Sequence, residues 1–273
     1  MFLNMEVIIA SDQNTLSRKC ADIIESQIKT LPDSVLGLAT GSTPVGLYTE
    51  LIKRHREHGL DFSGVRTFNL DEYVGIPENH PQSYRTFMNQ NLFDQINIKS
   101  ENTCVPDGMG ENPLDSGPLF EKKIKSAGGI DLQVLGVGTD GHIGFNEPTS
   151  SLRSKTRIKT LTHQTLEDNS RFFSEDEFQP KLAITMGIGT ILESRRILMM
   201  ATGESKALAV REMVEGSISA FFPATALQLH ERVTVIVDEP AASKLQLKGY
   251  YKFVGKLQDD LIKKHRPSDW ISR

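Results

Sequence analysis

Residues 35–55 read VLGLATGSTPVGLYTELIKRH, and this stretch decides the fold because it holds one full unit of a pattern that runs along the chain. Residues 35–38 form a short apolar run typical of a buried strand, and after the turn ATGSTP apolar and aromatic residues recur at helical spacing from Val45 to His55. Other runs of both kinds alternate in the same way. Strands are predicted at residues 5–10, 65–70, 132–137, 183–185, 196–201 and 233–237, and helices at 16–28, 83–93, 119–126 and 205–214.

Strands that alternate with helices pack as a parallel sheet with helices on both faces. We therefore predict an α/β fold that is Rossmann-like and doubly wound, with a mainly parallel sheet. The chain has no repeat, low-complexity tract or Gly/Ser-rich linker, so residues 1–273 are expected to form a single domain. Residues 142–180 lack clear periodicity, and a lid is predicted at about 160–182. The tail at about 257–273 is charged and helix-like and contains the only tryptophan, Trp270.

The composition excludes several classes of partner. The chain has 31 basic and 35 acidic residues, a net charge of −4, and no run of five like charges, whereas nucleic acids and anionic membranes require a basic footprint. The two cysteines, Cys20 and Cys104, have neither disulfide-framework nor metal-ligand spacing. The first residues lack the features of a signal peptide, and no apolar run reaches the ~18–20 residues of a membrane helix. We expect a soluble, cytoplasmic protein that acts on small molecules.

Ligands of open α/β sheets bind beyond the carboxyl ends of the strands, which here are residues 39–44, 71–73, 138–147 and 202–206. In the first segment, Gly41, Ser42 and Thr43 lie between a strand and a helix, where backbone N–H groups and hydroxyls suit a phosphate. The segment lacks the spacing and the lysine of a nucleotide-binding P-loop, so a sugar phosphate fits better. An ordinary turn with a hydroxyl cap is an equal alternative at this point.

Residues 136–141 read GVGTDG and match the glycine spacing of a dinucleotide-binding turn. Such a turn opens a helix and needs an acidic residue about 20 positions later, and neither condition is met. The segment instead places Asp140 and Glu147 around His142, which is an arrangement suited to general acid–base catalysis. The alternatives are a histidine on a surface loop and a zinc site, and zinc is disfavoured because the paired-histidine spacing is absent.

Three charged residues complete the candidate site. Asp71 directly follows the third predicted strand, and adjacent residues of an extended segment point to opposite sides, so Asp71 is the candidate acid and Glu72 is expected to be structural. Arg171, in the predicted lid, and Lys206, at the head of a helix, could bind phosphate. Taken alone, however, a surface lysine or arginine is usually only solvated.

Five segments together resemble the glucosamine-6-phosphate deaminases of the glucosamine/galactosamine-6-phosphate isomerase family. They are LGLATGSTPVGLY, FNLDEYVGIPENHPQSY, GVGTDGHIGFNEPTSSLRSKTRIKTLTH, NSRFF and SKALAVREMVEG, and the resemblance covers roughly residues 5–240. It implies conversion of glucosamine 6-phosphate and water to fructose 6-phosphate and ammonia, through ring opening, aldose–ketose isomerisation and deamination, with no metal or redox cofactor.

The resemblance also implies residue roles. Asp71 matches the base that moves a proton between carbons, and His142 matches the ring-opening histidine, with Asp140 and Glu147 as its partners. The phosphate ligands match Gly41, Ser42, Thr43, Arg171 and Lys206.

Some family members are hexamers activated by N-acetylglucosamine 6-phosphate, whose phosphate binds at a subunit interface. Ser150, Arg157 and Lys159 match ligands of that site, so an activator and a homo-oligomer, hexameric if it follows these members, are expected. Lys252 stands where the family pattern has a tyrosine, which is a departure from a complete activator site.

Two rival functions resemble parts of this pattern. A 6-phosphogluconolactonase would share the GxGxDGH loop but continue it without FNEP. A sugar-phosphate sensor of a transcription regulator would need a DNA-binding module, and the strand pattern that begins by residue 5 leaves no room for one.

Overall fold

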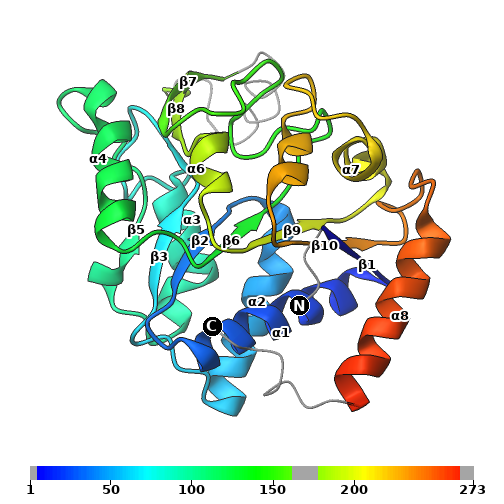
Figure 1. The fold of residues 1–273 in the computed structure, drawn as a ribbon. Helices are drawn as coiled ribbons and strands as arrows, with labels where there is room; N and C mark the ends of the chain where they lie inside the picture. The colour runs from blue at the N-terminus through cyan, green and yellow to red at the C-terminus, as the bar shows by residue number, and fades with distance from the viewer. Residues whose placement is uncertain (1–4, 162–177, 265–273) are drawn as a thin grey trace.

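A computed structural model describes residues 5–161 and 178–264, and its centre is a seven-stranded sheet with the order β1-β10-β9-β6-β2-β3-β5 (Figure 1). Every pairing within this sheet is parallel. Its strands are β1 (Glu6–Ala10), β2 (Val35–Leu38), β3 (Arg66–Asn69), β5 (Thr103–Cys104), β6 (Leu132–Leu135), β9 (Ile197–Ala201) and β10 (Val233–Asp238). The mainly parallel sheet predicted from the sequence is confirmed. Strand β5 was not predicted, because its two residues are too few to form a recognisable pattern.

Helices cover both faces of the sheet. Neighbouring residues of a strand point to opposite sides and therefore pack against different helices. Val35 and Leu135 are buried among side chains of α4, α6 and α7, while Leu36 and Val134 are buried among side chains of α1, α2 and α3. A strand buried on both faces is largely apolar; β2 is apolar throughout, and β6 has one polar residue, the buried Gln133. The helices are α1 (Gln13–Thr30), α2 (Ser42–His58), α3 (Tyr84–Asn91), α4 (Pro113–Ser126), α6 (Ile188–Leu192), α7 (Ala207–Glu215) and α8 (Lys248–Lys264), with short 3-10 turns η1 (Phe93–Gln95), η2 (Ser100–Asn102), η3 (Glu204–Lys206) and η4 (Pro223–Leu229).

A second, three-stranded sheet consists of β4 (Asp71–Tyr73), β8 (Leu182–Thr185) and β7 (Arg157–Thr160), and its pairings are antiparallel. The sequence predicted a strand at residues 183–185 within the parallel sheet. The strand is present, but its assignment to the parallel sheet is wrong. Its residues pair instead with β4. Strand β4 begins one residue after β3 ends and lies outside the main sheet, so its backbone is available to pair with β8. Strand β7 was not predicted because its residues are partly or fully exposed and two of the four are basic.

The predicted lid at about 160–182 overlaps β7 and β8 at its two ends, but residues 162–177 lie outside the described part of the chain. The single domain and the lid therefore stay predictions. Helix α8 begins before the predicted tail and packs against β1, and Trp270 lies outside the described residues. Within the described ranges, no helix is long and apolar enough to cross a membrane.

Candidate active site

The site lies where the strand order of the main sheet reverses. From β2 the chain builds outward through β3 and β5, and it then returns to β6 on the other side of β2 before it continues to β9 and β10. Loops that leave the carboxyl ends of β2 and β6 therefore diverge and flank a crevice, which is the usual ligand position in this architecture. Of the predicted segments, 39–44 and 138–147 follow these two strands, while 71–73 and 202–206 follow the neighbouring strands β3 and β9.

The segment after β2 presents a helix N-terminus without a side-chain cap. Gly41 precedes α2 with φ of 94°, a left-handed conformation suited to glycine, and within the described part of the chain no side chain caps the first N–H groups of the helix. Such N–H groups, together with the helix dipole, attract an anion. The alternative of an ordinary turn with a hydroxyl cap is not what the structure shows. Ser42 is exposed and Thr43 is partly exposed beside these groups.

Lys206 reaches the site from the segment after β9. It lies at the start of α7 and is partly buried, and burial lowers the pKa of its ammonium group while the charge of Asp140 opposes this shift. Arg171, the other predicted phosphate ligand, lies outside the described residues.

Asp238 holds the loop that carries Lys206. Its two carboxylate oxygens accept hydrogen bonds from Gly203 N at 3.1 and 3.0 Å, and one of them also accepts from Ala241 N at 2.8 Å. Sequence reasoning did not single out Asp238. The signal that could have found it is the one that found Asp71, an acidic residue at the carboxyl end of an apolar strand.

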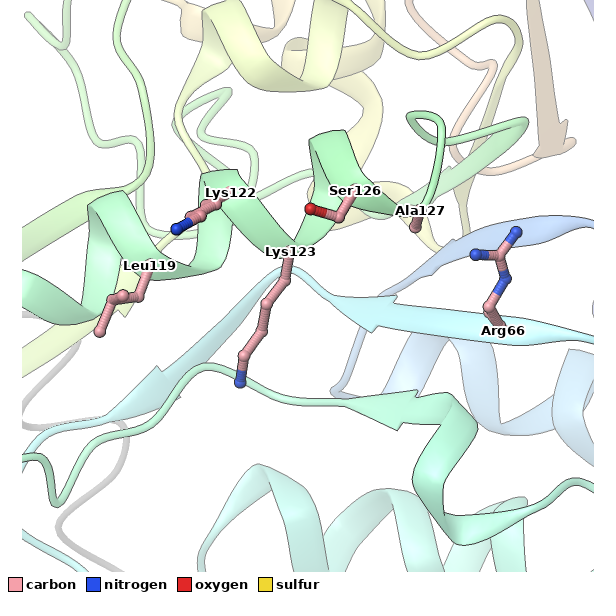
Figure 2. Close-up of a pocket in the computed structure, with 6 residues that line it drawn as sticks. All are labelled: Arg66, Leu119, Lys122, Lys123, Ser126 and Ala127. Carbon is pink, nitrogen blue, oxygen red and sulfur yellow. The ribbon is translucent and has the colours of Figure 1, made fainter.

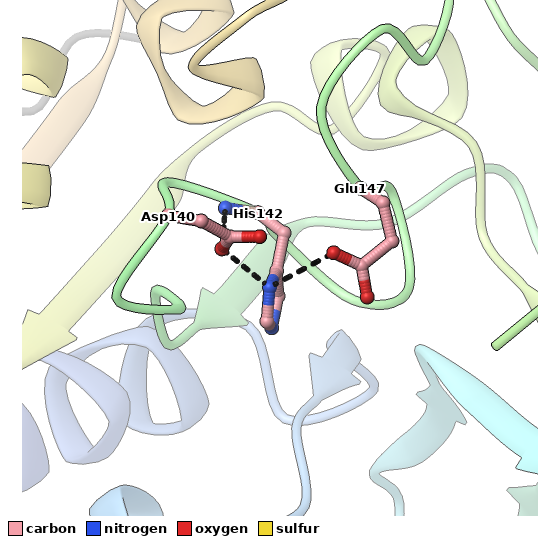
Figure 3. Close-up of side chains that lie close together, drawn as sticks. All are labelled: Asp140, His142 and Glu147. Atoms are coloured by element: carbon pink, nitrogen blue, oxygen red, sulfur yellow. Dashed lines mark hydrogen bonds and ion pairs between the residues drawn. The ribbon is translucent and has the colours of Figure 1, made fainter. Parts of the chain in front are cut away.

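His142 is held between two carboxylates of its own loop (Figure 3). Its Nδ1 lies 2.7 Å from Asp140 Oδ1 and 3.5 Å from Glu147 Oε2, and Asp140 Oδ1 also accepts a hydrogen bond from the backbone N of His142 at 3.2 Å. Because it pairs with two carboxylates, His142 is not the solvated histidine of a surface loop. One side of the imidazole is thus fixed by the protein, which leaves Nε2 for a ligand.

The charges within this cluster support one another. Burial alone would lower the pKa of an imidazole, but the hydrogen bonds and charges of Asp140 and Glu147 outweigh it and raise the pKa of His142 to about 9. In turn, although burial opposes ionisation, His142 holds the pKa of Asp140 well below its usual range. At neutral pH the cluster therefore contains an imidazolium beside an ionised Asp140.

The same three side chains lie close enough together to be considered as metal ligands. Each offers one ligand atom, and these atoms lie within 4.8 Å of one another. The raised pKa of His142 means that a metal would compete with a proton for Nδ1 at neutral pH.

Asp71 is the buried acid of the site. Its side chain is only 6% exposed, and burial, with a further contribution from the charge of Glu72, raises its pKa to about 7, while the charge of His142 opposes the shift. The pairing of Asp71 with Thr185 places β4 against β8. A carboxyl group with a pKa near 7 is suited to take up and return protons at neutral pH.

Glu72 has the structural role expected of it. Its carboxylate accepts backbone N–H groups of Tyr73, Tyr84 and Arg85, each at 2.9 Å, and so holds the start of α3. Because the two acids point to opposite sides of β4, one binds the fold together and the other faces the site.

The loop that carries His142 is anchored by two buried residues that the sequence did not reveal. Asn146 Nδ2 donates to Ile143 O and Met186 O, both at 2.8 Å, and Thr185 Oγ1 accepts from Phe145 N at 3.0 Å. Both anchors join this loop to the end of β8, about 40 residues away in the sequence. No local pattern reports such a contact.

The residues predicted for an activator lie beside this loop. Arg157 Nη1 donates to Asn146 Oδ1 at 2.9 Å, and burial lowers the pKa of the guanidinium. Lys159 lies two residues further along β7 and therefore points to the same side as Arg157. The Ser150 hydroxyl is buried and has no hydrogen-bond partner among the described residues. Lys252 lies on α8 and pairs with Glu239 at 2.5 Å.

A separate surface cavity of about 400 Å³ lies beside α4, with Lys123 and Arg66 reaching toward it from opposite sides (Figure 2). Arg66 is the first residue of β3, so this cavity lies away from the carboxyl ends of the strands. It is therefore separate from the site described above.

Comparison with known proteins agrees with this architecture. Residues 11–236 match the family described as glucosamine-6-phosphate isomerases/6-phosphogluconolactonase, which is more than half of the chain. The chain belongs to this family.

Similar proteins at 45% identity or more are described as glucosamine-6-phosphate deaminases. The glucosamine-6-phosphate deaminase of Hahella chejuensis is 58% identical over 250 residues, which cover 92% of this chain and 95% of that protein. A solved structure described as a monomeric glucosamine-6-phosphate deaminase is 45% identical, has a TM-score of 0.85, and covers 88% of this chain and 100% of the other. A 6-phosphogluconolactonase from Trypanosoma cruzi has a TM-score of 0.68 over 90% of this chain and 98% of its own, but at 22% identity it shows the fold alone.

The raised pKa of Asp71 makes stability depend on pH. An unfolded aspartate ionises near 3.8 and folded Asp71 near 7, so between these values the folded state binds more protons and its stability falls as pH rises. The Asp71→Asn variant has no group that ionises at this position, so it does not lose stability in this way as pH rises. Since one pKa unit corresponds to about 1.4 kcal/mol, we expect the free energy of unfolding of Asp71→Asn, relative to that of the unmodified protein, to rise by about 2–4 kcal/mol between pH 4 and pH 8 in urea titrations. The exposed Asp33→Asn is the matched control, and an equal response in both variants would contradict the buried-acid interpretation.

Proposed function

We propose that this chain is a glucosamine-6-phosphate deaminase, which converts glucosamine 6-phosphate and water to fructose 6-phosphate and ammonia. The observation that carries the proposal is the placement of a buried acid with a raised pKa, Asp71, at the same sheet edge as the paired His142. The relatives that are 45% identical or more and bear this description support it. The two groups supply the two kinds of proton transfer that the reaction requires.

In the first step, His142 opens the sugar ring. Its imidazolium gives a proton to the ring oxygen O5 and takes one from the hydroxyl at O1, so the charge of the histidine is restored. Asp140 and Glu147 hold Nδ1 and stabilise the cation, and this fixes Nε2 as the nitrogen that meets the substrate.

In the second step, Asp71 moves a proton between neighbouring carbons. Its carboxylate takes the proton from C2 of the open sugar while the aldehyde oxygen O1 gains a proton from His142, which gives an enolamine. Asp71 then returns its proton to C1, and the amino nitrogen gives one proton back to His142, which leaves a C2 imine. Water then adds at C2 and ammonia leaves, so that atoms and protons balance. A carboxyl with a pKa near 7 can both accept and donate at neutral pH.

The phosphate supplies binding energy remote from the reacting carbons. The uncapped N–H groups of α2 beside Gly41, Ser42 and Thr43 are proposed to bind its oxygens, together with Lys206 and Arg171. Asp238 contributes indirectly, because it holds the backbone of the loop that carries Lys206.

Steady-state ammonia release from glucosamine 6-phosphate is the direct test. We expect turnover that is unaffected by a metal chelator, and we expect Asp71→Asn to retain sugar-phosphate binding but to lose at least about 10³-fold in kcat, because the variant has no base to take the C2 proton. Hydrolysis of 6-phosphogluconolactone, measured in parallel, tests the rival enzyme. Lactone hydrolysis without ammonia release would refute the proposal, and binding without either turnover would favour a sensor.

The pH dependence of kcat/KM should reflect both groups. Activity is expected to fall below about pH 7, where Asp71 becomes protonated, and above about pH 9, where His142 loses its proton. Asp140→Asn separates the two limbs, because it removes a charge that raises the pKa of His142. The alkaline limb should move to lower pH while the acid limb stays in place; if neither limb moves, the limbs belong to the substrate.

We also propose that the protein self-associates and that Arg157 and Lys159 form the basic half of an activator site for N-acetylglucosamine 6-phosphate. A similar solved deaminase is described as monomeric, so the solution mass must be measured against the 30.4 kDa chain. Where the site is complete, the activator should raise activity at low substrate, and Lys159→Gln should remove this effect. Lys159 is the cleaner choice, since Arg157 also holds Asn146. A monomer with a hyperbolic substrate curve that the activator does not change would exclude both ideas.

A further inference from the structure

The GVGTDG turn contains three glycines, and the structure gives each a different environment. A Cβ atom placed on Gly136 would meet nothing within 4 Å. Gly141 has φ of 84° and lies against Phe222. A Cβ atom placed on Gly138, in contrast, would lie 2.3 Å from both Cε1 and Nδ1 of the His142 ring and 2.6 Å from Nε2.

We propose that Gly138 is a positioning residue for His142, because the imidazole occupies the space that any side chain at position 138 would fill. This inference takes its catalytic meaning from the proposed function, but its geometry stands without it. It also explains the resemblance of the motif to a dinucleotide-binding turn, since glycine is required here for close approach by a side chain of the protein rather than by a pyrophosphate.

The ring has little freedom to move away from a methyl group at position 138. Three of its atoms would lie within 2.6 Å of the added carbon, and ordinary contacts are 3.4–4 Å, so the ring would have to move by about 1 Å. Its Nδ1 already lies 2.7 Å from Asp140. A displacement of this size away from Asp140 would weaken this close ion pair.

The backbone of residue 138 has equally little freedom. Gly138 N donates to His142 O at 2.9 Å, and Gly138 O accepts from Gly141 N at 3.1 Å. These bonds close the turn onto itself directly after β6. A substitution at 138 is therefore expected to act through the imidazole rather than through a rearranged loop.

The test compares Gly138→Ala with Gly136→Ala, which adds the same methyl group two residues away where nothing opposes it. The first readout is the titration of the His142 ring in the free protein, followed by NMR and assigned by its absence in His142→Gln. We expect the His142 pKa to fall by at least about one unit in Gly138→Ala, because separation from Asp140 and Glu147 removes the interactions that raise it, and to stay unchanged in Gly136→Ala.

The second readout is turnover. A misplacement of about 1 Å can reduce a rate about 10²-fold, so kcat of Gly138→Ala should fall by about that factor with KM little changed. A folded Gly138→Ala with an unaltered His142 titration and with kcat within about threefold of the unmodified enzyme would overturn the proposal. If the unmodified enzyme released no ammonia, the proposed function would fail, while the titration would still decide the role of Gly138.

A double-mutant cycle keeps the proposal testable where Gly138→Ala folds poorly. His142→Ala removes the ring that the new methyl would meet. Gly138→Ala should therefore lower the urea midpoint in the native background and lower it much less in the His142→Ala background. An equal loss in both backgrounds would show that the substitution harms the backbone and not the placement of the imidazole.

Discussion

The reversal of strand order between β2 and β6 is the constraint on which the candidate site depends. Because the chain builds the sheet outward on one side of β2 and then on the other, the loops after β2 and β6 separate and leave a crevice between them. The first loop brings an open helix N-terminus and the second brings His142. Neither would meet the other if the strands followed one another in simple order.

The two titratable groups at this crevice are tuned by opposite means. Asp71 gains its raised pKa mainly from burial, which disfavours charge. His142 gains its raised pKa from two carboxylate partners, which favour charge and overcome its burial. Both shifts also depend on contacts elsewhere in the fold. Glu72 accepts a backbone hydrogen bond at the start of α3, and Asn146 and Thr185 fix the loop that carries His142. The environment therefore assigns an acid–base role to each group.

Much of the sheet could be predicted because strands such as β2, β6 and β9 are buried on both faces and largely apolar, and such runs stand out in a sequence. Strand β7 could not, since its side chains are largely exposed and it is ordered by pairing with β8. Several of the predicted site residues lie in segments directly after strands of the main sheet: Gly41, Ser42, Thr43, Asp71, Asp140, His142 and Lys206. Those that were missed, such as Asp238 and Thr185, act through backbone N–H groups distant in sequence, and only the folded chain brings these partners together.

The fold alone does not distinguish a deaminase from a lactonase, since a 6-phosphogluconolactonase shares it at 22% identity. The distinction must come from side chains at the same sheet edge. Isomerisation needs a base that can hold a proton and return it to a neighbouring carbon, and the buried Asp71 meets this need because desolvation brings its pKa near neutrality. Hydrolysis of a lactone requires no transfer between carbons. The burial of Asp71 is therefore the feature of this crevice that the proposed deamination uses.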